Sequence, residues 1–205
     1  MPRDKSASHM KVNKAIKEEF LEKGFEAASV RSIGARAGMT SAGLYRHYAD
    51  KEAMFDAMVE PLITSLKEWV EHHTRKKYEM LEEEDMEMEL FGETFLDLIR
   101  EVILPRRDEF KLLMEGSAGT KYENFIHDFV EENQKVFLDA IRSMKKRGYP
   151  AVDMEEGELH LLLSAYLTAC FEPIVHGYSI EQIEKYLNTV HDFFMPGWRK
   201  IMGMK

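Results

Sequence analysis

The stretch of sequence that decides the fold is FEAASVRSIGARAGMTSAGLYRHYADKEAMF, residues 25–55. It predicts two short helices, over residues 29–37 and 40–47, each beginning with a residue that can cap a helix, Ser29 in the first and Thr40 or Ser41 in the second. Gly38, between them, can adopt the left-handed backbone conformation that a tight turn requires. Apolar residues of the two segments are spaced to pack against each other: Val30, Ile33, Ala37, Leu44 and Tyr48. This is the layout of a helix-turn-helix, in which the second helix of the pair lies in the major groove of DNA.

The remainder of the chain also reads as helix, because no segment alternates apolar and polar residues over the length of a strand. The predicted fold class is therefore all-α, with about nine helices. Two capping boxes, Thr120 with Glu123 and Ser179 with Gln182, mark helix starts, and Pro61 should kink or divide the fourth helix. The expected helices cover residues 11–23, 29–37, 40–47, 50 to beyond 69, 87–104, 105–116, 120–148, 153–176 and 179–195.

Charge is distributed unevenly along the 205 residues. Residues 1–51 hold ten Lys or Arg against six Asp or Glu, a net charge of +4. Residues 52–205 hold 18 basic and 31 acidic residues, a net charge of −13. A basic end on an acidic body suggests a polyanion-binding head, although an excess of four charges also arises by chance. We expect a DNA-binding head over residues 1–55 and a helical body over residues 56–205.

Composition excludes several classes of protein. Hydrophobic residues make up 44% and charged residues 32% of the chain, proportions typical of a globular protein. Cys170 is the only cysteine, which rules out an internal disulfide and a thiolate zinc site, and no metal or cofactor is expected. Apolar runs such as residues 161–165 are too short to cross a membrane, and no secretory signal follows Met1. A cytoplasmic location is expected.

An enzyme is one alternative, because a helical bundle rich in Glu and His could hold two iron ions. That site needs a glutamate three residues before a histidine, and no histidine of this chain has one. Four Glu/His pairs instead have the i, i+4 spacing of ordinary surface pairs, and neither a phosphate-binding glycine loop nor a Gly-x-Ser-x-Gly motif is present. We therefore expect no enzymatic activity.

A more specific indication comes from individual residues in and around the helix-turn-helix. In order and spacing they resemble the signature of the TetR family of transcriptional regulators: Phe20, Gly24-Phe25, Ala28-Ser29-Val30, Ile33, Ala37-Gly38-Met39, Leu44-Tyr45, His47-Tyr48, Lys51-Glu52 and Phe55. The rest of the chain is similar to the family only in length and helix count. The resemblance implies a homodimeric repressor with an amino-terminal DNA-binding head, a body that binds a small effector, and a dimer interface made by the last two helices.

The resemblance also assigns roles to residues of the head. It places Tyr45, His47 and Lys51 against DNA phosphates, so that replacing Lys51 should weaken binding to every sequence. It places Thr40, Ser41 and Arg46 on the recognition helix and Arg31 on the helix before it. Because a guanidinium can donate two hydrogen bonds to guanine, the two arginines are the candidates for reading base sequence.

Two glycines depart from the family pattern. Gly43 stands where the family often has threonine, and it lowers the stability of the short helix by about 1 kcal/mol relative to alanine. We interpret it as a point where the backbone approaches the duplex closely, and include it among the DNA contacts. Gly34 replaces the commoner alanine and is interpreted as tolerance in packing.

The body carries many bulky apolar side chains, which either fill a core or line an effector cavity. The candidate effector contacts are Phe91, Phe95, Phe110, Met114, Tyr122, Phe125, His127, Phe129, Tyr166 and His176. Residues 159–175 are apolar on nearly all sides, and residues 183–194 carry an apolar seam, so these two helices are the candidate dimer interface. The interface candidates are Leu163, Leu167, Ile183, Leu187, Val190 and Phe194.

The predicted function is a ligand-responsive transcriptional regulator, expected to be a repressor, that binds a palindromic operator as a homodimer and is released by a small apolar or amphipathic effector. The expected partners are double-stranded DNA, that effector and a second copy of the chain, with no membrane. The alternative is a helical protein-binding adaptor without sequence-specific DNA binding, which would leave the basic head and the helix-turn-helix unexplained.

Overall fold

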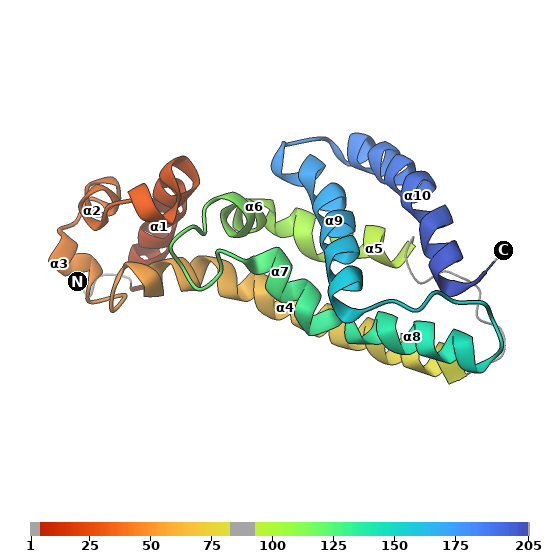
Figure 1. Cartoon of the computed structure of the whole chain (residues 1–205). Coiled ribbons are helices and arrows are strands. Elements are labelled where there is room, and N and C mark those ends of the chain that lie inside the picture. Colours follow the sequence, from red (N-terminus) through yellow and green to blue (C-terminus); the bar gives the residue numbers. More distant parts are fainter. Residues whose placement is uncertain (1–4, 83–92, 205) are drawn as a thin grey trace. The chain divides into compact units, whose positions relative to one another are not determined.

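The computed structural model of the chain describes residues 5–82 and 93–204 (Figure 1). Every regular element in these two ranges is helical, which confirms the all-α prediction. The α-helices are α1 (Lys5–Ala27), α2 (Val30–Ala37), α3 (Ser41–Leu44), α4 (Lys51–Glu82), α5 (Glu93–Leu98), α6 (Arg107–Glu115), α7 (Phe125–Asn133), α8 (Lys135–Lys146), α9 (Glu156–Val175) and α10 (Ile180–Met202). A π-helical turn, Ile99–Ile103, and a 3-10 turn, Leu104–Arg106, connect α5 to α6.

The chain forms two compact units. The first contains the residues up to Ser65 together with Arg106–Glu123, and the second contains Leu66–Pro105 and the residues from Asn124 onward. The chain first passes from the first unit to the second after Ser65, ten residues beyond the expected boundary after residue 55. Residues 106–123, which the sequence assigned to the body, belong to the first unit. Pro61 does not divide α4, which continues to Glu82. The chain passes into the second unit after Ser65, four residues beyond Pro61.

In the first unit, α1, α2 and α3 gather around the amino-terminal part of α4 (Figure 1). The apolar face of α1 is fully buried, and the ring of Phe20 meets the ring of Phe55 on α4 edge to face at 5.2 Å. At Gly24 the backbone leaves helical geometry with a φ of 70°, at the predicted stop. These contacts fix the carboxyl end of α1 beside the start of α4.

The connections around α2 and α3 largely follow the sequence prediction. The hydroxyl of Ser29 accepts a hydrogen bond from Ser32 N, and Gly38 ends α2 with a φ of 68°. Thr40 caps α3, but α3 ends at Leu44 rather than at residue 47. Residues 45–47 follow as a turn, closed by a hydrogen bond of 2.8 Å from His47 N to Leu44 O. The predicted recognition helix is therefore only one turn long.

Helix α6 joins the first unit through long-range contacts. The amide of Phe25 donates to Gly116 O at 2.8 Å, and Lys17 pairs with Glu109 at 2.5 Å. Phe110 is completely buried. Such pairings join residues about ninety positions apart, which explains why local sequence patterns assigned this segment to the body.

The second unit is built around α9, with α7, α8 and α10 packed in its core. Helix α9 has the length and mean hydropathy, 1.2, of a membrane-crossing helix, a property that short apolar runs did not reveal. Leu159, Leu163, Tyr166 and Cys170 are nevertheless buried among the other helices, so it serves as the core helix of this unit. Burial raises the pKa of the Cys170 thiol to about 12, and the prediction of a buried cysteine is confirmed.

Several helix boundaries differ from the expected ones. Thr120 and Glu123 lie in a turn before α7, because the Thr120 hydroxyl donates to Ser117 O and accepts from Tyr122 N instead of capping a helix. The expected long helix is divided at Gln134. Helix α9 begins at residue 156 with a capping box between Glu155 and Glu158 rather than at residue 153, and α10 runs past residue 195 to 202. Residues 87–92, where the expected fifth helix begins, lie outside the described residues.

Candidate nucleic-acid interface

The short helix α3 and the turn after it are held in place by buried and hydrogen-bonded side chains. Leu44 is completely buried, and the Tyr48 hydroxyl, whose burial raises its pKa, donates to Asn13 Oδ1 at 2.6 Å. The hydroxyl of Thr40 accepts from Gly43 N at 3.1 Å and caps the helix. Leu44 therefore faces the interior, and Tyr48 ties the turn after α3 to α1.

Most of the candidate DNA contacts lie on the exposed side of α2, at the cap of α3 and in the turn after α3. Tyr45 is 50% exposed, and Arg31, Thr40, Arg46 and His47 are also exposed. Ser41, at the first position of α3, is partly buried. Among the residues that the structure describes, the side chains of Arg31 and Arg46 form no hydrogen bond or ion pair, so both guanidinium groups are available to a ligand. The segment is therefore accessible, as an interface with a duplex requires.

The two unusual glycines have different surroundings. Gly43 is buried beneath Met39 and Thr40, which leaves little backbone surface for the close approach to DNA that we expected. At Gly34, a methyl group would lie 2.8 Å from the carbonyl oxygen of Met39. Gly34 is thus required where the turn after α2 folds back on the helix, and the interpretation as packing tolerance is wrong.

These contacts give opposite expectations for the two alanine substitutions. Gly34→Ala should lower the free energy of unfolding by about 1–3 kcal/mol, because the clashing atom is backbone and cannot rotate away. Gly43→Ala is the matched control: its methyl group would lie at ordinary contact distances of 3.5 Å or more, so we expect a gain of up to about 1 kcal/mol from helix propensity. Urea unfolding followed by circular dichroism measures both. Equal effects of the two substitutions would contradict the assignment.

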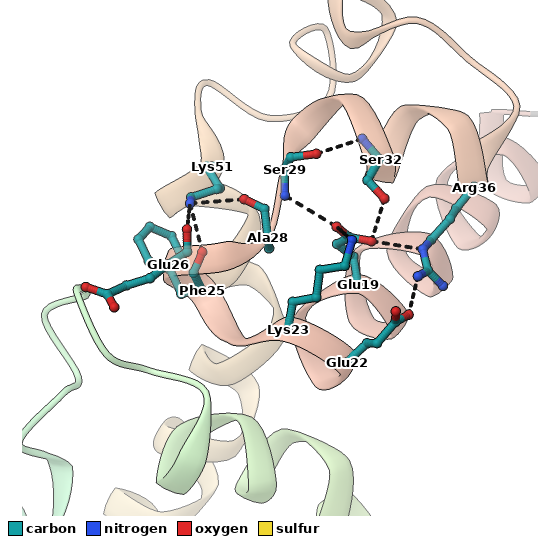
Figure 2. A network of polar contacts seen from close by, with 10 residues as sticks. All are labelled: Glu19, Glu22, Lys23, Phe25, Glu26, Ala28, Ser29, Ser32, Arg36 and Lys51. Atoms are coloured by element: carbon teal, nitrogen blue, oxygen red, sulfur yellow. Dashed lines mark hydrogen bonds and ion pairs between the residues drawn. The ribbon is translucent and has the colours of Figure 1, made fainter.

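A buried carboxylate, Glu19, joins α1 to α2 (Figure 2). Its Oε2 atom accepts from Ser32 Oγ at 2.7 Å and from Arg36 Nε at 2.9 Å. Its Oε1 atom accepts from Lys23 Nζ at 2.9 Å and from Ser29 N at 3.4 Å. Burial alone would raise the pKa of Glu19, but the hydrogen bonds outweigh it and lower the pKa to about 2. The carboxylate is therefore charged and fully bonded at neutral pH.

Arg36 is shared between two acids, Glu19 and Glu22. Its hydrogen bond with Glu22 is the main cause of its raised pKa. Sequence reasoning missed this network, although Glu19 lies seven residues after Val12, on the apolar face of α1. A charged residue at a buried position of an amphipathic helix is the signal that could have revealed it.

The side chain of Lys51 is also hydrogen-bonded within the head. Its ammonium group donates to the backbone oxygens of Phe25 at 2.8 Å, Ala28 at 3.3 Å and Glu26 at 3.4 Å, and lies 4.3 Å from the centre of the Phe25 ring (Figure 2). Its side chain thereby ties the first residue of α4 to the end of α1. Its role as a DNA contact stays a prediction.

Several cations of the head are bonded to acids within the first unit. Lys17 and Lys23 are paired with acids, as is Arg36. The cations left for a polyanion are fewer than the sequence count suggests, and Arg46, in the turn after α3, is one of them.

The candidate effector contacts are distributed over both units. Phe110, Met114 and Tyr122 belong to the first unit, where the Tyr122 hydroxyl donates to Glu60 Oε1 at 2.6 Å. The others belong to the second unit: Phe125, His127, Phe129, Tyr166 and His176. Phe91 lies outside the described residues, as does the side chain of Phe95. None of the eight candidates whose side chains are described lines the hollow of about 690 Å³ beside the end of α10 or that of about 320 Å³ between α1 and α6.

The histidines among these candidates have partners at the surface. His160 Nε2 and His127 Nδ1 are 2.7 Å apart, so one ring donates to the other. His176 lies 2.9 Å from Glu172 within α9. In the ranges that the structure describes, no group of three or more His, Cys, Asp or Glu side chains is arranged to hold a metal ion.

The candidate dimer contacts face inward within one chain. Leu163, Ile183 and Val190 are buried, and Leu167, Leu187 and Phe194 pack against the same core. The surface of these helices is instead formed by other apolar side chains: Leu161 on α9 is 71% exposed and Phe193 on α10 is 79% exposed. Positions 161, 165, 168 and 172 form one exposed face of α9. The seam identified in the sequence is thus the contact between α9 and α10 of the same chain.

Comparison with known proteins finds a match for part of the head. Residues 14–58 match the family of bacterial regulatory proteins named tetR. A TetR-like transcriptional regulator from Rhodococcus sp. RHA1 has a TM-score of 0.54 and 15% identity, with 99% of each chain covered, a likeness of fold alone. NalD, the secondary repressor of the MexAB-OprM multidrug efflux pump in Pseudomonas aeruginosa, has a TM-score of 0.46 and 16% identity, over 96% of this chain and 97% of NalD. No curated protein matches the chain.

Proposed function

We propose that this chain, whose residues 14–58 match the tetR family of bacterial regulatory proteins, is a DNA-binding transcriptional regulator that acts as a homodimeric repressor in the cytoplasm and is released from a palindromic operator by a small effector. The observation that carries the proposal is the exposed end of α3. Tyr45, Arg46 and His47 project from a segment whose other face is fixed by Leu44. A phenol, a guanidinium and an imidazole supply hydrogen-bond donors for phosphate oxygens and base edges.

A homodimer is supported by the exposed apolar face of the second unit. Leu161 on α9 and Phe193 on α10 are large, apolar and more than two-thirds exposed in the single chain, and the exposed face of α9 continues from Leu161 through Ala165 and Thr168 to Glu172. An apolar face of this kind is characteristic of a contact with another protein. A homodimer would carry two recognition helices, as a palindromic operator with half-sites about 34–36 Å apart requires.

An effector is supported by unsatisfied polar atoms within the second unit. Gln134 Oε1 and Ser164 Oγ are buried and have no hydrogen-bond partner among the described residues. A buried polar atom without a partner is costly, and water or a bound molecule commonly satisfies it. We propose an amphipathic effector, largely apolar with a polar group. Release of bound DNA by such compounds, titrated one at a time, tests this part of the proposal.

The first test selects duplexes from a pool of random-sequence DNA with the full-length protein. Enrichment of a palindromic motif is the expected result, and a chain that enriches no sequence would be better described as a protein-binding adaptor. A reporter gene placed behind the selected duplex then tests repression. Lower transcription in the presence of the chain is expected, and higher transcription would contradict a repressor.

Replacing Arg46 with alanine should relax the base preference at one position of each half-site. The loss should be about 1–3 kcal/mol for the preferred base and close to zero for the other bases, because a bidentate contact discriminates against the wrong base. Quantitative gel shifts with single-base variants of the selected duplex measure it. Lys14→Ala, which removes a 77% exposed charge of α1, is the control. If the base preference of the Arg46 variant is unchanged, another residue must contact the bases, and Arg31 is the next candidate.

A further inference from the structure

The turn between α1 and α2 is held from two sides by charged side chains (Figure 2). On one side the carboxylate of Glu19 accepts from Ser29 N. On the other side the ammonium of Lys51 donates to three backbone oxygens of residues 25–28. A lysine ammonium has three donors, and here all three have an acceptor. These oxygens belong to the segment that follows the helical break at Gly24, so the ammonium holds the connection between α1 and α2.

We infer that Lys51 is a positioning residue that sets the orientation of the recognition helix, rather than a ligand of DNA phosphate. This inference rests on the proposed function, because it concerns how the head binds DNA. Lys51 begins α4 and its acceptors end α1, so α2 and α3 lie in the loop of chain that the contact closes. The angle at which α3 is presented therefore depends on this closure.

Binding a phosphate would require Lys51 to give up these acceptors. Three carbonyl oxygens at the end of α1 would lose their partner, and the ammonium would leave the face of the Phe25 ring. The same turn is bonded to α6, because Phe25 N donates to Gly116 O. The contact is thus one part of a bonded junction, and the free cations Arg31 and Arg46 are better suited to meet the polyanion.

Salt dependence distinguishes the two roles. A residue that neutralises a phosphate releases counterions, so its removal reduces the slope of log Kobs against log[salt] by about 0.9 per contact, or about 1.8 for the two copies in a dimer. A positioning residue makes no such contact. Its removal lowers affinity at every salt concentration and leaves the slope unchanged.

The experiment measures binding of full-length protein to the duplex selected by the wild type, at five salt concentrations. Lys51→Met, which keeps most of the side-chain length without the charge, should lose about tenfold in affinity along a line parallel to that of the wild type. Lys51→Arg should also lose affinity, because a planar guanidinium does not match three converging oxygens. Lys14→Met is the matched control, with little change expected in affinity or slope. Circular dichroism at the assay temperature reports the folded fraction of each variant.

Three results would overturn the inference: a reduced slope in Lys51→Met, wild-type affinity in Lys51→Met, or wild-type affinity in Lys51→Arg. The arginine variant decides the question if the methionine variant fails to fold, since arginine binds phosphate as well as lysine does. Failure of the proposed function has a different signature, because the wild-type protein would then select no duplex at all.

Discussion

Replacement of Glu19 by glutamine is expected to lower the free energy of unfolding of the first unit by about 3–5 kcal/mol, the usual cost of breaking a buried ion pair from one side. The carboxylate is fully buried and accepts four hydrogen bonds, two of them from the cations Lys23 and Arg36. A glutamine has one acceptor oxygen, and its amide group would point donors at other donors. The contact between α1 and α2 should loosen as a result.

Urea unfolding of the full chain, followed by circular dichroism, measures this loss. The matched control is Glu22→Gln, which removes the other acid bonded to Arg36 but from an exposed position, 56% accessible. Surface pairs contribute about 0–1 kcal/mol, so the control should stay within that range. Similar losses in the two variants would show that the buried carboxylate contributes no more to the free energy of unfolding than the exposed one.

The same carboxylate makes the stability of the first unit depend on pH. Its pKa is about 2 in the folded protein and 4.5 as the ordinary value, a depressed pKa that stabilises the fold wherever the group is charged in both states. This contribution is fully present above pH 4.5 and is lost as the pH falls toward 2. A shift of this size corresponds to about 3 kcal/mol. The stability advantage of the wild type over Glu19→Gln should therefore shrink between pH 4.5 and pH 2.

Replacement of Phe193 by glutamate is expected to convert the proposed dimer into a monomer and to weaken binding to the palindromic duplex about 100-fold or more. Twofold symmetry would place both new carboxylates in one apolar interface, where a charge without a partner costs several kcal/mol. The substitution should leave the fold of the chain unchanged, because the side chain is 79% exposed. Leu161→Glu should act in the same way from α9.

Sedimentation equilibrium measures the oligomeric state, and gel shifts on the selected duplex measure affinity. Tyr149→Glu is the control: this aromatic side chain is 46% exposed but lies outside α9 and α10, so the dimer should persist. A dimer that survives both Phe193→Glu and Leu161→Glu would place the interface on another face. A wild-type protein that is monomeric at all concentrations would remove the dimer from the proposed function.

Local signals in the sequence were sufficient for the helix-turn-helix. Ser29 caps α2, Gly38 ends it, and Thr40 caps α3, each within four residues of the atoms it contacts. The capping box of Ser179 and Gln182 was likewise identified from four consecutive residues. Such features depend on the residue types at fixed short spacing, which is why a sequence reveals them.

The parts that the sequence did not reveal depend on distant pairings. Lys51 lies 23 to 26 positions from its carbonyl acceptors, and the contact of Phe25 with Gly116 joins residues that no periodic pattern connects. The apolar seam of α10 was identified correctly as a contact surface. Its spacing does not tell whether the seam contacts another helix of the same chain or a second copy of the chain. Apolar residues recur with the same helical period in both kinds of contact.

The inclusion of residues 106–123 in the first unit restricts how regulators of this kind can be recombined. A chimera that joined the first 65 residues to the body of another regulator would lack Phe110 and the Gly116 oxygen that accepts from Phe25 N. Its α1 would then expose apolar surface and an unbonded amide. A working exchange of effector specificity would have to transplant α6 and the following turn together with the head, so natural shuffling at the single point after residue 65 is disfavoured.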